Sequence, residues 1–155
     1  MNTTSLNGIY NFRAISDRIG TSGQPTVKQL SSIREAGFEG IINLALPTSD
    51  NALPDEGSLV TSLGMFYVHI PVNFEAPSHQ DFRAFCGVMD AMKERRVFVH
   101  CAANMRVSAF MFLYRVLKEK TARADAERDM HAIWQPDEVW SRFIRDELAN
   151  SPSRS

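Results

Sequence analysis

Short apolar runs and amphipathic stretches alternate along this chain. The runs at 40–46, 65–71 and 96–100 are rich in isoleucine, valine and aromatic residues, which is typical of buried strands. Residues 9–15 alternate more weakly and predict a first strand or a hairpin, and the glycine- and serine-containing segment 20–25 predicts a loop.

Apolar residues at helical spacing predict helices between and after these strands. Thr26 and Gln29 fit a capping box, and Gly37 follows at the position where a helix commonly ends. Ser78 fits a second N-cap, with Asp81 in the first turn that follows. The predicted helices cover about 26–36, 55–63, 78–92, 107–118, 122–133 and 137–148.

Strands that alternate with helices predict an α/β fold, with a mostly parallel central sheet flanked by helices. A chain of 155 residues has room for one domain with a substantial core. We therefore predict a single domain over residues 1–150 and a disordered tail over residues 151–155.

Composition removes several classes of function. The net charge is −1, without the basic surface that nucleic-acid binders need, and there is no apolar segment of about 20 residues that could span a bilayer. Two cysteines and no secretory signal predict a cytoplasmic protein. His69, His79 and His131 share no ligand spacing, so we predict no metal site, and no cofactor is indicated. The sequence leaves the oligomeric state open.

The segment 97–108 carries the chemistry. A predicted buried strand ends at His100-Cys101, a short loop follows, and a helix begins near Arg106. Amide groups at a helix start bind anions and stabilise a cysteine thiolate. Arg106 can hold an oxyanion with two parallel hydrogen bonds. Cys86, on a predicted amphipathic helix, is instead predicted to be a core residue.

The order of strand, His-Cys, loop, Arg and helix resembles the protein tyrosine and dual-specificity phosphatase superfamily. Upstream, Ser22-Gly-Gln-Pro25, Gly37-Phe38, Ile41-Ile-Asn-Leu44 and Tyr67-Val-His-Ile-Pro-Val72 are similar to a bacterial phosphatase-like family related to the domain fused to metallo-β-lactamase-like hydrolases. The resemblance covers roughly residues 15–118. It implies that Cys101 is the nucleophile and that Ser108 assists hydrolysis of the intermediate. It also implies a phosphate-binding loop, formed by Ala102, Ala103, Asn104, Met105 and Arg106.

The loop departs from the superfamily pattern in two ways. Four residues separate Cys101 from Arg106, whereas the superfamily has five, so a gapless comparison places Val107 at the arginine position. Asn104 stands where the family usually has glycine, and asparagine tolerates positive φ better than other non-glycine residues.

A further departure from the superfamily concerns the general acid. The superfamily uses an aspartate on the loop that here follows Val72, but Asn73 occupies that position and an amide cannot serve as the acid. Glu75 is the candidate replacement, and Asp81 is a weaker candidate because it lies on the predicted helix.

Three functions remain open from the sequence. The first is a cysteine-dependent phosphatase that hydrolyses a phosphomonoester through a thiophosphate on Cys101. The second is a rhodanese-like sulfurtransferase that carries a persulfide on Cys101, because rhodanese-type loops are shorter by about this one residue. The third is a catalytically impaired pseudo-phosphatase that binds a phosphorylated ligand or a free anion such as phosphate or sulfate.

Overall fold

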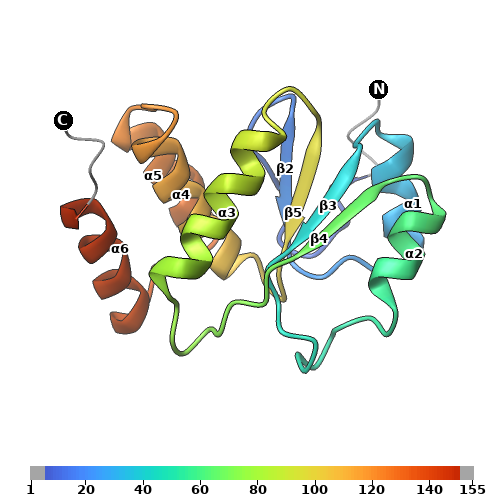
Figure 1. The fold of residues 1–155 in the computed structure, drawn as a ribbon, viewed down its shortest axis with the longest axis horizontal. Helices are drawn as coiled ribbons and strands as arrows, with labels where there is room; N and C mark the ends of the chain where they lie inside the picture. Colours follow the sequence, from blue (N-terminus) through green and yellow to red (C-terminus); the bar gives the residue numbers. More distant parts are fainter. Residues whose placement is uncertain (1–5, 151–155) are drawn as a thin grey trace.

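A computed structural model of the chain describes residues 6–150 and shows one sheet between two groups of helices (Figure 1). The predicted tail 151–155 lies outside the described residues. In chain order the elements are β1 (Arg13–Ala14), β2 (Ile19–Ser22), α1 (Val27–Glu35), β3 (Gly40–Asn43), α2 (Glu56–Ser62), β4 (Phe66–His69), α3 (His79–Ala91), β5 (Val97–His100), α4 (Met105–Leu117), α5 (Arg123–His131) and α6 (Glu138–Asn150).

The sheet has the strand order β1-β2-β5-β3-β4. All neighbouring pairs are parallel except β1 with β2, which is antiparallel. The predicted α/β fold with a mostly parallel sheet is therefore confirmed. β5, which leads into Cys101, lies at the centre of the sheet.

Both faces of the sheet are covered by helices. Alternate residues of β3 point to opposite faces, so Ile42 joins the core under α3, α4 and α6, while Ile41 joins the core under α1 and α2. Figure 1 shows α1 and α2 on one side of the sheet and α3 to α6 on the other. Burial on both faces explains why the strands are short, continuous apolar runs.

The two predicted N-caps and the predicted end of the first helix are confirmed. Thr26 and Gln29 form the reciprocal capping box at the start of α1, and Gly37 after its end has φ of 100°. Ser78 accepts a hydrogen bond from the amide of Asp81 at the start of α3.

The prediction of a loop over residues 20–25 is wrong in its first half, because β2 occupies Ile19–Ser22. The small residues of this strand lie against aromatic rings. A Cβ on Gly20, for example, would be 2.8 Å from the ring of Phe98. The strand is buried along its whole length without being rich in large apolar residues, so its sequence carries little hydrophobic signal.

Candidate active site

The carboxyl ends of four parallel strands meet in one row. Ser22 of β2 and Asn43 of β3 both pair with His100 of β5, and Asn43 also pairs with His69 of β4. Cys101 follows His100 directly, at the centre of this row. Ligands bind beyond the carboxyl ends of the strands in open α/β sheets, so the topology places the thiol where such a site is expected.

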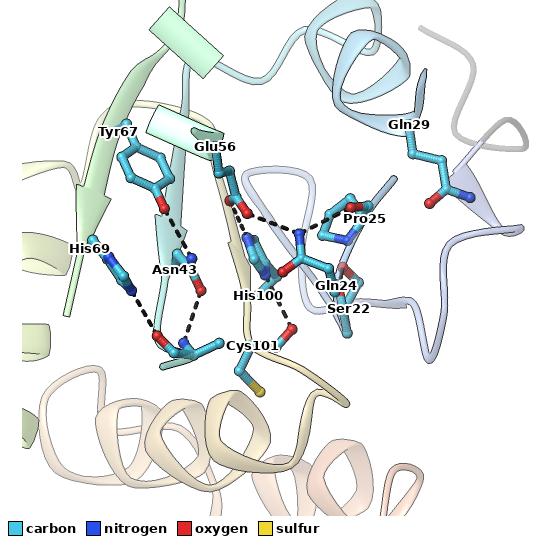
Figure 2. Close-up of polar contacts among 12 residues, drawn as sticks. Ser22, Gln24, Pro25, Gln29, Asn43, Glu56, Tyr67, His69, His100 and Cys101 are labelled. Carbon is cyan, nitrogen blue, oxygen red and sulfur yellow. Dashed lines mark hydrogen bonds and ion pairs between the residues drawn. The ribbon is translucent and has the colours of Figure 1, made fainter. Parts of the chain in front are cut away.

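Cys101 is completely buried, and its amide donates a hydrogen bond to the carbonyl of Ser22 at 3.3 Å. In Figure 2 its sulfur points away from the end of β5, toward the side where α4 lies. The sequence prediction of a cysteine between a buried strand and a helix start is confirmed.

The loop carbonyls after Cys101 are held by the surrounding scaffold. Ala102 O accepts from the amide of Gln24 at 3.1 Å and from Asn51 Nδ2 at 3.1 Å, and Ala103 O accepts from Asn11 Nδ2 at 3.0 Å. In a trans peptide the N–H points opposite to the C=O. The amides that follow these two carbonyls therefore point away from these donors.

Asn104 makes the turn from the loop into α4. Its φ is 68°, in the left-handed region, which agrees with the prediction that this position needs a tolerant backbone. Its side chain is buried, and Nδ2 donates to Asn11 O at 2.9 Å and to Thr21 Oγ1 at 3.2 Å. Asn104 thus adopts the left-handed backbone conformation and also hydrogen-bonds the loop to β2 and to the segment before β1.

Arg106 lies in the first turn of α4 and is 6% exposed. Its Nη1 donates to Val72 O at 2.9 Å, on the loop after β4, and its guanidinium lies 5.8 Å from the ring centre of Phe74. Among the described residues, nothing accepts a hydrogen bond from its buried Nε. Val107, the gapless alternative, is fully buried in the core, so the guanidinium at the site belongs to Arg106.

A buried charged group supports the base of the cysteine loop, and sequence reasoning did not assign it. His100 Nε2 lies 2.6 Å from Glu56 Oε2, with side chains 0% and 4% exposed. Gln24 Nε2 donates to Glu56 Oε1 at 2.9 Å, and His100 Nδ1 lies 3.2 Å from Cys101 O (Figure 2). These hydrogen bonds join α2 to the cysteine through the last residue of β5.

The hydrogen-bond partners define the charges of this group. Cys101 O only accepts, so His100 Nδ1 donates to it. Burial by itself raises the pKa of the Glu56 carboxyl, but the hydrogen bond and charge of His100 and the hydrogen bond of Gln24 outweigh burial and lower the pKa. Glu56 is then a carboxylate that contacts both His100 Nε2 and Gln24 Nε2. Nothing in the local sequence around Glu56 indicates this pairing, because His100 is 44 residues away.

Ser108, which the resemblance assigned to hydrolysis, lies on α4 beneath the loop. Its hydroxyl donates to Met105 O at 2.8 Å and accepts from Trp134 Nε1 at 2.9 Å. In this arrangement the hydroxyl links the helix start to the segment before α6. Its catalytic role stays a prediction.

An open cleft lies beside the cysteine loop. Its lining includes the loop residues Ala102 and Ala103, Arg106, and side chains from the loops after β3 and β4. Glu75 lies in this lining and is exposed, whereas Asp81 is not part of it. Asn73 Oδ1 accepts a hydrogen bond from the backbone amide of Glu75 at 2.9 Å. The Asn73 side chain, which stands where the family has aspartate, therefore closes the turn that carries Glu75.

Asp50 is a second acidic residue in this lining, and the sequence reasoning did not select it. It lies on the loop between β3 and α2, next to Asn51, whose side chain bonds to the cysteine loop. Only the fold brings this loop beside Cys101.

The second cysteine is a core residue, as predicted. Cys86 is 9% exposed on α3, and burial raises its pKa to about 12. Within residues 6–150, no three potential metal-ligating side chains gather in one place, and no helix is long and apolar enough to cross a membrane.

The comparisons with known proteins identify the family of the chain. Residues 12–143 match the family described as DSP-PTPase phosphatase fused to NAD+ kinase. The chain belongs to this phosphatase family. Within known structures, it is similar to a DUF442 protein of Shewanella putrefaciens CN-32, with 34% identity, a TM-score of 0.87, and coverage of 97% of this chain and 99% of the other.

More distant phosphatases share the fold. Kinase associated phosphatase aligns with a TM-score of 0.75 at 13% identity, over 93% of this chain and 98% of the other. A curated relative, the beta-lactamase hydrolase-like protein of Agrobacterium fabrum, is 32% identical over 116 residues. That match covers 73% of this chain but only 27% of the relative. The resemblance drawn from the sequence motifs is confirmed.

Proposed function

We propose that this chain is a cysteine-dependent phosphatase that hydrolyses phosphomonoesters through a thiophosphate on Cys101. The Cys101 thiolate attacks phosphorus, and the bond from phosphorus to the leaving oxygen breaks as that oxygen takes a proton from a carboxylic acid. A water molecule then attacks phosphorus, gives its proton to the resulting carboxylate, and releases phosphate and the Cys101 thiolate.

The observation that carries this proposal is the state of Arg106 beside the cysteine loop. One guanidinium nitrogen is fixed by Val72 O, while Nε is buried without an acceptor among the described residues. A buried donor of this kind costs free energy unless a ligand satisfies it. A phosphoryl oxygen held by Arg106 and the loop amides would satisfy it, and the guanidinium geometry suits bidentate oxyanion binding.

Glu75 is the proposed proton donor. Its exposed side chain lies in the lining of the cleft beside the cysteine loop. The Asn73 turn holds its backbone, so the carboxyl group is carried by an ordered loop. A proton donor contributes most to the hydrolysis of esters with poor leaving groups.

The two alternatives carried over from the sequence make distinct predictions. The short Cys101–Arg106 loop favours a rhodanese-like persulfide, for which thiosulfate treatment would add one sulfur to Cys101. A pseudo-phosphatase would bind phosphate at Arg106 without turning over any ester. The family match weighs toward the phosphatase.

The test is turnover of an aryl phosphate by the parent, by Cys101→Ser and by Cys86→Ala. We expect turnover in the parent and in Cys86→Ala, and none in Cys101→Ser. Cys86→Ala is the matched control because it removes the other thiol, which is buried in the core. Binding of phosphate without turnover in the parent would favour the pseudo-phosphatase, and a persulfide would favour the sulfurtransferase. A cytoplasmic location stays a prediction.

A further inference from the structure

A substrate with several negative charges needs several basic side chains around its site, and the cleft beside the cysteine loop lacks them among its described lining residues. Among the described residues that line it, Arg106 is the single basic side chain, and Asp50 and Glu75 are both acidic. The Arg106 guanidinium is taken up by the phosphate that reacts, because it is buried beside the cysteine loop. No cation in this part of the described structure is left for a second phosphate.

The loop that carries Asp50 is held against the cysteine loop by the neighbouring residue. Asn51 Nδ2 donates to Ala102 O, one residue after Cys101, which fixes the loop between β3 and α2 against the cysteine loop. Asp50 is exposed at this edge of the cleft. A carboxylate there repels any further negative charge carried by a substrate.

The rim also offers an apolar surface. Tyr10 lines the cleft with 54% of its surface exposed, although large hydrophobic side chains are otherwise mostly buried in this protein. Gly23 makes room for it, because a Cβ there would be 2.7 Å from Tyr10 Cδ2 and 2.7 Å from Ala102 O. The aromatic ring therefore lies close to the cysteine loop.

We infer that the substrate is a monoester with a single phosphate, whose remaining body carries no second anionic group and is uncharged or cationic. Asp50 is the residue that discriminates against a second anion. This inference rests on the proposed function, since it takes the Cys101 loop as the site that holds the phosphate.

The experiment compares two substrates that differ only by one phosphate, hydroquinone monophosphate and hydroquinone bisphosphate. In the parent, kcat/KM per phosphate should be higher for the monophosphate. Asp50→Asn should narrow that ratio by about three- to tenfold at low salt, which is the order of the effect of one exposed charge at the edge of the cleft. The effect should shrink at high salt.

Asp55→Asn is the matched control. Asp55 lies on the same loop, is exposed, makes no side-chain cap hydrogen bond and is not in the cleft lining. Asparagine also tolerates its φ of 59°. This variant should keep the parent's ratio at both salt concentrations.

Binding of the same two compounds to Cys101→Ser, with and without Asp50→Asn, separates the two proposals. If the parent hydrolyses neither compound but Asp50→Asn still narrows the affinity ratio, the proposed function fails and this inference stands. The inference is overturned if the bisphosphate is preferred, if Asp50→Asn leaves the ratio unchanged, or if neither compound binds.

Discussion

The Glu56–His100 pair offers the sharpest test of how the fold supports its site. Glu56→Ala would leave the buried Nε2 of His100 and the side-chain amide of Gln24 without the carboxylate that both contact in the parent. Removing one partner of a buried ion pair costs about 3–5 kcal/mol. For a chain of this length that loss corresponds to a fall in Tm of roughly 6–20 °C.

Glu56→Gln is the matched variant, because the network can keep its hydrogen bonds without charge. His100 in its neutral form would still donate from Nδ1 to Cys101 O and would accept at Nε2 from the nitrogen of the introduced amide. The oxygen of the introduced amide would accept from Gln24 Nε2, as the carboxylate does in the parent. We expect the stability of this variant to lie within about 1 kcal/mol of the parent at neutral pH.

The pH dependence of stability separates the parent from the two variants. The pKa of Glu56 is lower in the folded protein than its ordinary value of 4.5, so the carboxylate stabilises the fold above that value. This contribution is lost as the pH falls through the folded-state pKa. Both variants lack this carboxylate, so the loss of stability that Glu56 causes in acid should be absent from them.

Urea denaturation followed by circular dichroism at several pH values measures both effects. The reasoning is refuted if Glu56→Ala is as stable as the parent, or if Glu56→Gln is as damaging as Glu56→Ala. The first result would mean that the pair adds no stability, and the second that the charges themselves are needed.

Three further variants test other parts of the site. Arg106→Lys keeps the positive charge but loses the two parallel hydrogen bonds of a guanidinium, so phosphate affinity measured by calorimetry should fall about tenfold or more. Unchanged affinity would exclude Arg106 as the anion ligand. Asn104→Ala should be about 1–2 kcal/mol less stable than Asn104→Gly in urea, because alanine resists the positive φ; equal stabilities would contradict that reasoning. Glu75→Gln should slow hydrolysis of alkyl phosphates by about 10²–10⁴-fold and of activated aryl phosphates less; an equal effect on both would mean that Glu75 does not supply the proton.

The sequence predicted the parts of the fold that local patterns encode. Apolar runs such as 96–100 gave the central strands, and the capping residues Thr26 and Ser78 gave two helix starts to the residue. β2 was missed because its small residues are buried by neighbours rather than by their own size. Sequence periodicity reports the apolar side chains that a strand contributes to a core, and after Ile19 this strand has only glycine, threonine and serine.

The site was predicted as far as it is contiguous in the chain. Cys101 and Arg106 stand five positions apart, and their strand–loop–helix context shows in the sequence alone. Glu56 and Asp50 come from the segment between β3 and the start of α2, which only tertiary packing brings beside the cysteine loop. Polar groups of this kind have no periodic signature, so the fold is needed to find them.

The central claim is that Cys101 carries the phosphoryl group during turnover. Rapid quenching of the parent in acid during hydrolysis of an aryl phosphate, followed by peptide mass spectrometry, measures this directly. The account predicts a phosphoryl group on the peptide containing Cys101, present also in Cys86→Ala and absent in Cys101→Ser. Turnover that persists in Cys101→Ser, with no phosphoryl group on this peptide in the parent, would contradict it.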